Sequence, residues 1–394
     1  MTAIRLVFLA LGAGMGGLIP FGTVILAGKG FDAATIGLVL AVAAAAGVLT
    51  TPIWGHLGDT VLGRRRVLQL SSLGAAIALL VFGTAGIPIV ITAAWVAYSA
   101  AAATTMPTAD AVAVNAVRTA GRGDFGRLRL LVSLSFGSAA IATGFLYNTT
   151  GYAPAPFLAA GCLGLAMLAS RLVPDLPSDP AAAAAAHRRG GAVAQAFSVQ
   201  PRLPIVLFTF GLGIIGMLTV FTYLPLRIAE LGGAPSDVAL AAGLESMAEI
   251  PGFIIASAIA ARLGLRALYV ASAILMACCG MVLVGLDSPT LMIGVRLLTG
   301  PAYAGLTVAS VLALGVLLPP SLQATAQGLS AMTMGMASIA VGILGGLLYE
   351  VAGAQTLFAV TAIATLFAAA IAWRVLPGRI TMPGRGAPVT GPGA

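Results

Sequence analysis

Long, uninterrupted apolar runs dominate the chain, and short polar or glycine-rich stretches separate them. Each run is about 20 residues long, which is the length an α-helix needs to cross the hydrocarbon core of a bilayer. The strict alternation of β-barrel strands is missing, so helices must satisfy the backbone hydrogen bonds in lipid. The pattern predicts an all-α membrane protein with twelve spans, at about residues 4–27, 34–57, 67–86, 88–115, 128–147, 155–173, 203–226, 235–261, 267–286, 289–317, 322–349 and 355–376.

The composition supports this interpretation. Hydrophobic residues make up 59% of the 394 residues and charged residues only 8%, whereas a soluble domain carries about 25% charged residues. So few charges could not cover the surface of a soluble fold, which excludes soluble enzymes, nucleic-acid binders and disordered proteins. The three cysteines all lie inside apolar runs, so neither a disulfide framework nor a metal site is expected.

The basic residues predict the orientation of the spans. The net charge is +8, and the 20 Lys and Arg residues lie in short clusters between apolar runs. If the amino terminus is cytoplasmic, all of them except Lys29, Arg227 and Arg296 fall on the cytoplasmic side, which is the expected positive-inside bias. We therefore expect a multi-pass protein of the cytoplasmic (inner) membrane with both termini inside the cell.

A hydrophilic stretch at 174–202 divides the apolar runs into two sets of six, in residues 1–173 and 203–376. Features of the first set recur in the second: Pro20 and Asp32 are matched by Pro225 and Asp237. These observations predict two pseudo-symmetric six-helix bundles joined by a cytoplasmic linker, with a disordered cytoplasmic tail at 377–394.

The loop between the second and third spans carries the most specific motif. Gly55, Asp59 and Gly63 precede Arg64 and Arg65 there. This resembles the signature loop of the major facilitator superfamily, in which a Gly and an Asp precede Gly-Arg-Arg, although one extra residue stands between Asp59 and Gly63. The resemblance implies a transporter with two six-helix bundles, and it implies that these five residues form a breakable electrostatic latch between the bundles.

Two further regions resemble the lactose permease and phenylpropionate permease group of that superfamily. One runs from Met106-Pro107 through Asp110 to Gly126-Arg127-Leu128-Arg129, and the other is Ala248-Glu249-Ile250-Pro251. The lactose permease also has a His and a Glu in its tenth helix, and this chain has neither between 289 and 317. Proton coupling by that route is therefore not expected here.

Acids inside the spans are the main candidates for function, because an ionisable group in hydrocarbon is costly. Glu245 and Glu249 lie one helical turn apart, so they share a face, and two carboxylates in a low dielectric favour holding at least one proton. We expect them to couple solute movement to protons; the alternative is that each only bonds a neighbouring helix. Asp110 is expected to pair with Arg129 and to exchange it for solute, or else to be a structural partner of Arg127 or Arg129.

Arg296 and Tyr303 complete the expected solute site. Arg296 could bind an anionic solute, or it could pair with Glu350 or Glu230 near the outer surface. Tyr303 could line the solute cavity or simply pack between helices.

The leading functional hypothesis is a secondary transporter that works by alternating access, imports a small organic solute of the aromatic acid or sugar class, and couples this to protons. A proton-driven exporter of sugars or drugs is the alternative. The sequence contains no hydrolase motif at a shared depth, so no enzyme activity is expected. No cofactor, metal or nucleic acid is expected either, and a two-bundle protein is complete as a monomer in the bilayer.

Overall fold

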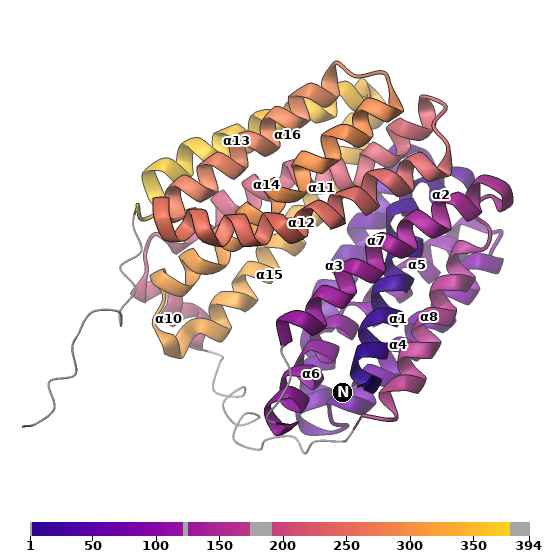
Figure 1. The fold of residues 1–394 in the computed structure, drawn as a ribbon, viewed down its shortest axis with the longest axis horizontal. Helices are drawn as coiled ribbons and strands as arrows, with labels where there is room; N and C mark the ends of the chain where they lie inside the picture. Colours follow the sequence, from indigo (N-terminus) through magenta and orange to yellow (C-terminus); the bar gives the residue numbers. More distant parts are fainter. Residues whose placement is uncertain (1, 121–124, 174–190, 379–394) are drawn as a thin grey trace, which may run out of the picture.

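The computed structural model describes residues 2–120, 125–173 and 191–378. Within these ranges every regular element is helical, and Figure 1 shows the helices in two groups that meet at one end and diverge toward the other. In chain order the elements are α1 (Thr2–Leu18), η1 (Ile19–Phe21), α2 (Gly22–Gly28), α3 (Ala33–Thr60), α4 (Arg64–Thr84), α5 (Pro88–Ala102), α6 (Thr105–Ala120), α7 (Phe125–Thr150), α8 (Ala155–Ser170), α10 (Ala192–Val199), α11 (Leu203–Glu230), α12 (Pro235–Leu263), α13 (Leu265–Val284), α14 (Pro289–Leu317), η3 (Pro320–Leu322), α15 (Gln323–Ala340), the π-helix η4 (Val341–Gly345) and α16 (Gly346–Val375).

Ten helical segments of the described residues are long and apolar enough to cross a membrane, which confirms an all-helical, multi-pass membrane protein. The last segment, Thr325–Val375, is 51 residues long, and Gly353 interrupts its helix with φ 80° and ψ 169°. Ala155–Ser170 is a shorter apolar helix. The count of twelve spans stays a prediction. Most of the expected linker and tail, at 174–190 and 379–394, lies outside the described residues.

Three spans that the sequence predicted as continuous are interrupted. The one expected at 4–27 contains the 3-10 turn η1. The one expected at 88–115 is divided between α5 and α6, and the one expected at 322–349 contains the π-helix η4. A π-turn shifts the hydrogen-bond partners of the backbone. The buried hydroxyl of Tyr223 donates to the carbonyl oxygens of Val341 (3.2 Å) and Gly342 (3.1 Å) in this turn, so α11 is fixed against it.

Turn glycines repeat along the chain. All the described residues with positive φ are glycines, and they fall into three pairs spaced by 201 or 202 residues. Each pair occupies equivalent turns between consecutive long helices, as expected for an internally repeated chain. The pairs are Gly30 and Gly232, Gly63 and Gly264, and Gly151 and Gly353.

Replacing Gly264 by alanine is expected to destabilise the protein by about 1–3 kcal/mol, because φ 90° and ψ 170° belong to a region that essentially only glycine occupies. A thermal-shift assay in detergent measures this loss. Gly86→Ala is the control, since Gly86 has neither a positive φ nor a neighbour within 4 Å of a new Cβ. Equal melting temperatures for the two variants would contradict the strain argument.

The two groups of helices are packed together at one end, which we call the closed end. One hydrophobic core there combines buried side chains of both groups, such as Ile36 and Tyr223. Between the described residues, three hydrogen-bonded contacts connect the groups: the backbone N–H of Ala33 donates to Glu350 (3.0 Å), Asn148 and Ser236 bond each other twice (3.0 and 2.9 Å), and Ser246 donates to the Ser133 carbonyl (3.3 Å).

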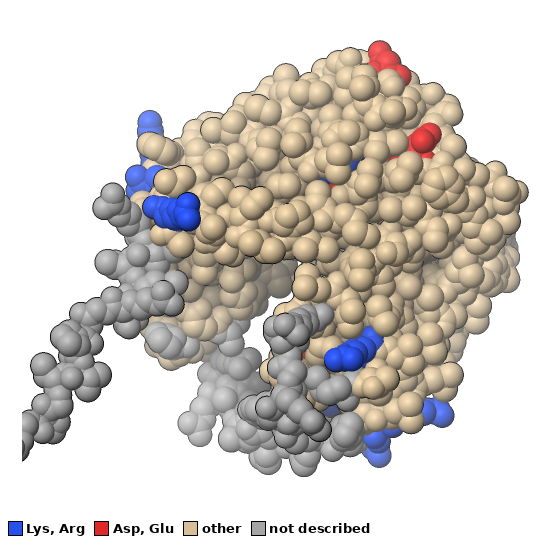
Figure 2. All heavy atoms as spheres, viewed as in Figure 1, with Lys and Arg blue, Asp and Glu red and all other residues tan. Residues whose placement is uncertain are grey.

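The opposite end, which we call the open end, has no such shared core among the described residues. The second hydrophobic core contains only residues between 192 and 376. Figure 2 shows the surface hollowed between the two groups at this end. On the face shown, most Lys and Arg side chains lie at helix ends on the open side, and the visible acidic clusters lie toward the closed end.

Candidate functional site

The candidate site begins with the close packing of α12 against α14. A Cβ added to Gly300 would lie 2.6 Å from the carbonyl oxygen of Glu245 and 3.1 Å from the backbone nitrogen of Glu249. A Cβ added to Gly252 would lie 2.8 Å from the Cα of Pro301. Glycine at these two positions therefore lets the backbones approach closely, and this approach brings the polar side chains of both helices into contact.

Glu245 and Arg296 form a buried ion pair between these helices. Each residue is only 3% exposed, and Nη2 of Arg296 contacts Oε2 of Glu245. Thr299, which is fully buried, donates to Oε1 of Glu245 at 2.7 Å. The guanidinium carbon lies 5.9 Å from the ring centroid of Phe221 on α11. Nη1 of Arg296 is buried without a hydrogen-bond partner in the described part of the chain, so the arginine retains one free donor.

Glu249 lies one turn further along α12 and is only partly buried. Within the described part of the chain, its carboxylate makes no ion pair or hydrogen bond. Of the two neighbouring acids, one is therefore paired with an arginine and the other is unpaired among the described residues.

Tyr303 follows Thr299 by one turn on α14 and lines a small cavity of about 100 Å³. The cavity also contains Phe210 and Tyr269, with Thr307 and Thr333 among its polar members. Tyr303 therefore lines a cavity within the second helix group, and its role in binding solute stays a prediction.

Asp110 and Arg129 form the second ion pair, between α6 and α7. Nη1 of Arg129 lies 3.5 Å from Oδ1 of Asp110, and the two side chains are 50% and 30% exposed. The expected pairing of these two residues is therefore present, and their role in binding solute stays a prediction. The side chain of Arg127, the alternative partner, lies outside the described residues. This pair and the Glu245–Arg296 pair belong to different helix groups and form two separate centres.

The contacts described for the signature loop lie within the first helix group, and its role as a latch between the bundles stays a prediction. Asp59 pairs with Arg64 at 3.2 Å, and Arg65 donates to the carbonyl of Val173 at 3.2 Å, so both contacts stay within the first group. Gly63 begins α4 with φ 77°, and Gly55 has open space around it. The loop lies at the open end, where the groups are apart.

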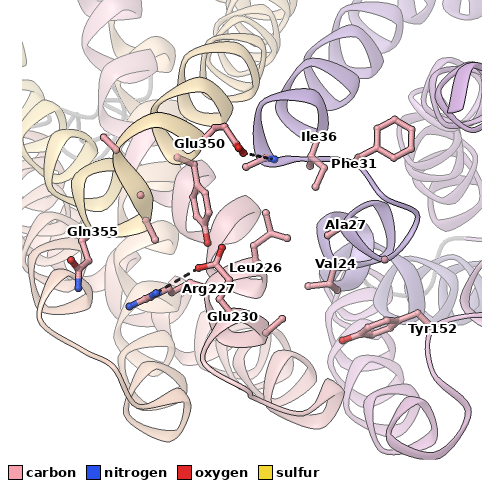
Figure 3. Close-up of a pocket in the computed structure, with 17 residues that line it drawn as sticks. Val24, Ala27, Phe31, Ile36, Tyr152, Leu226, Arg227, Glu230, Glu350 and Gln355 are labelled. Carbon is pink, nitrogen blue, oxygen red and sulfur yellow. Dashed lines mark hydrogen bonds and ion pairs between the residues drawn. The ribbon is translucent and has the colours of Figure 1, made fainter.

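Contacts at the closed end show that the two alternative partners suggested for Arg296, Glu230 and Glu350, bond other groups. Glu230 pairs with Arg227 (3.5 Å), and Glu350 accepts a hydrogen bond from the backbone N–H of Ala33 (Figure 3). Arg227 also pairs with Asp287 at 2.8 Å. Glu230 and Glu350 line a cavity of about 670 Å³ between the groups. Arg296 pairs with Glu245 instead.

Sequence reasoning missed several residues that connect the groups. Asn148, Ser236 and Glu350 bond across the closed end, and no local pattern marks such contacts, which depend on how separate helices meet. Thr299 could have been found, because it lies three residues after Arg296 and shares its helix face.

Sequence comparison places the chain among membrane permeases. A profile of the MFS_1 like family matches residues 1–360. A maltose permease of Geobacillus stearothermophilus is 27% identical over 349 residues, which is 88% of this chain and 86% of the permease.

Solved transporter structures share the fold. The nucleoside transporter NupG superposes with a TM-score of 0.78 at 16% identity, covering 95% of this chain and 98% of that one. A D-xylose–proton symporter superposes with a TM-score of 0.69 at 14% identity, covering 96% and 98%. A peptide transporter in complex with alafosfalin gives a TM-score of 0.71 at 14% identity, covering 95% and 93%. The relatives found by sequence and by fold are thus transporters, not enzymes.

Proposed function

Because the chain belongs to the MFS_1 like family of major facilitator transporters, we propose that it is a proton-coupled symporter that moves a small organic solute across the cytoplasmic membrane by alternating access. The solute belongs to the aromatic acid or sugar class. The observation that carries the proposal is the buried Glu245–Arg296 pair with the unpaired Glu249 one turn away.

The proposed membrane topology has twelve spans, with the helix broken at Gly353 and the short helix Ala155–Ser170 each supplying one more than the ten long segments. Two six-helix bundles, 1–173 and 203–376, are joined by a linker at 174–202 and followed by the tail 377–394. Both termini and the open end face the cytoplasm, since the basic residues gather there. The protein works as a monomer.

Alternating access follows from the two ends of the molecule. In the described conformation the closed end faces outward and the space between the bundles opens to the cytoplasm. Solute that has bound from outside is released to the cytoplasm when the two bundles come together at the closed end and separate at the open end. Asp59, Arg64 and Arg65 would then join the bundles only in the opposite, outward-facing state, where their ends approach each other.

Proton coupling is assigned to the two acids of α12. Glu249 takes up a proton on the outer side and releases it to the cytoplasm, because it has no cation of its own. Glu245 holds Arg296, whose free Nη1 donor is available to an acceptor group of the solute. Asp110 and Arg129, together with Tyr303, complete the solute site on both sides of the bundle boundary.

Glu249→Gln is expected to abolish solute accumulation driven by a pH gradient while solute exchange across the membrane partly persists, because glutamine mimics the protonated acid and cannot release a proton. Proteoliposomes with an imposed pH gradient measure accumulation of maltose, D-xylose and aromatic acids, and counterflow measures exchange. Asp287→Asn, which alters an exposed ion pair at the closed end, is the control. Full gradient-driven accumulation by Glu249→Gln would show that the proton site lies elsewhere.

A further inference from the structure

A second large cavity lies inside the first helix group. Its volume is about 550 Å³, which is within the range of small-molecule sites. Helices α1, α3, α5, α6 and α8 surround it, and Ser338 on α15 lines it from the other bundle. The cavity therefore reaches the boundary between the bundles, where a transported solute passes.

The walls of this cavity are mainly apolar. Leucine, alanine, glycine and methionine side chains make up most of the lining, and its polar members are Trp95, Tyr98, Ser99, Thr105 and Ser338. Two of these already have partners: Thr105 donates to Ser71 (3.3 Å), and Ser338 donates to the Met334 carbonyl (3.0 Å). Few polar groups remain to bind a solute.

An aromatic wall is fixed on one side of the cavity. The Trp95 ring lies 4.9 Å from the Phe82 ring and 5.6 Å from the Tyr98 ring, centroid to centroid. A Cβ on Gly22 would lie 3.1 Å from the Trp95 indole, so glycine leaves room for that ring. Such a rigid wall favours stacking or edge contacts with a planar ring.

Two donors of this wall lack hydrogen-bond partners in the described part of the chain, and their polar atoms are accessible rather than fully buried. Trp95 is 6% exposed and Tyr98 is 9% exposed, and within the described part of the chain neither the indole N–H nor the phenol hydroxyl makes a hydrogen bond. A ligand that covers such a donor without accepting a hydrogen bond from it would bind less well, because the donor would lose its hydrogen bond to water. An acceptor atom brought in by a ligand would satisfy them.

We propose that this cavity binds the ring of the transported solute, which is a largely apolar aromatic or alicyclic compound with an acceptor group for Tyr98. A sugar carries a hydroxyl on most of its carbons, and each one buried here without a partner would oppose binding. The inference rests on the proposed transport function and narrows its solute class from aromatic acid or sugar to ring compounds with few polar groups.

The test uses the full-length protein with Trp54 and Trp373 replaced by phenylalanine, so that Trp95 is its one tryptophan and can be excited selectively. Heavy-atom quenching requires near contact with the indole. The probes are 4-bromobenzoate, 4-bromobenzyl alcohol and 4-bromobenzylamine, which present one ring with three different polar groups. We expect at least one to quench Trp95 saturably and maltose not to compete.

Pocket-filling variants make the result specific. Ala44→Leu on α3 and Ala102→Leu on α5 add side-chain volume to the lining, and each is expected to weaken quenching at least about tenfold. Ala46→Leu makes the same change on α3 outside the lining and should leave it unchanged. Tyr98→Phe is expected to weaken binding by about threefold to tenfold, the equivalent of one hydrogen bond. Thermal-shift curves identify any variant that does not fold. If one of the two filling variants fails to fold, the quenching of the other one tests the proposal.

Several results would overturn the proposal. These are quenching that never saturates with any of the three probes, quenching that both filling variants leave unchanged, and protection of Trp95 by maltose. Strong quenching by phosphatidylcholine with brominated acyl chains would show that lipid occupies the cavity instead. No gradient is applied in these measurements, so a protein that binds ring compounds without transporting them would refute the proposed function while its cavity would still be a ring-binding site.

Discussion

Arg296→Met is expected to destabilise the protein by about 3–5 kcal/mol and to abolish transport, because it leaves the carboxylate of Glu245 buried without a counter-ion. Glu245 and Arg296 are each 3% exposed, so water cannot replace the lost partner. Thermal unfolding in detergent, followed by size-exclusion profiles, measures the loss of stability.

The double variant Glu245→Leu with Arg296→Met separates stability from function. It removes both charges, and Thr299 keeps its second acceptor, the carbonyl of Arg296, at 3.0 Å. We expect stability to recover to near the wild-type value while transport stays absent. Arg227→Met is the matched control, since its partners Asp287 and Glu230 are 69% and 48% exposed and such pairs contribute about 0–1 kcal/mol. A stable Arg296→Met protein with normal transport would contradict the assignment of this pair.

Gly37→Val is expected to reduce transport by more than about tenfold by preventing the closed end from forming. A Cβ on Gly37 would lie 2.2 Å from the carbonyl oxygen of Gly342 and 2.8 Å from the Cα of Gly346, and both are backbone atoms that cannot rotate away. Because α3 and the η4–α16 segment belong to different bundles, the strain disfavours only the state in which they touch.

Cysteine accessibility detects this shift, since a population held open at the closed end labels faster there and more slowly at the open end. Gly161→Val is the control, because a new Cβ at this helical glycine would meet nothing within 4 Å. Unchanged labelling and transport in Gly37→Val would mean that the contact between these helices does not limit the cycle.

Much of the fold could be predicted because hydrophobic length alone determines a membrane span. The long helices lie where the apolar runs indicated, and the turn glycines repeat between the two halves of the chain. The break between α5 and α6 and the π-turn at Val341–Gly345 could not be predicted, because they depend on packing against other helices.

The sequence identified most residues of the candidate site, but it identified few of the contacts between them. Asp110 and Arg129 could be paired from sequence because both lie near the same ends of consecutive helices. The partner of Arg296 could not be predicted from sequence. The pairing depends on how α14 is rotated relative to α12, and these two helices are not consecutive in the chain. Trp95 and Tyr98 gave no signal at all, because an empty space beside a side chain leaves no trace in a periodic pattern.

We propose that the proton on Glu249 decides which end of the molecule is closed. Double electron–electron resonance tests it directly in a variant without the three native cysteines. One spin-label pair, on Thr60 and Gln327, spans the open end, and another, on Thr149 and Thr290, spans the closed end; all four residues are exposed. The account predicts that a change from about pH 8 to about pH 6 moves the two distance distributions in opposite directions, and that Glu249→Gln gives one distribution at both pH values. This would be contradicted by distance distributions that do not change with pH in the wild type, or that change with pH in Glu249→Gln as much as in the wild type.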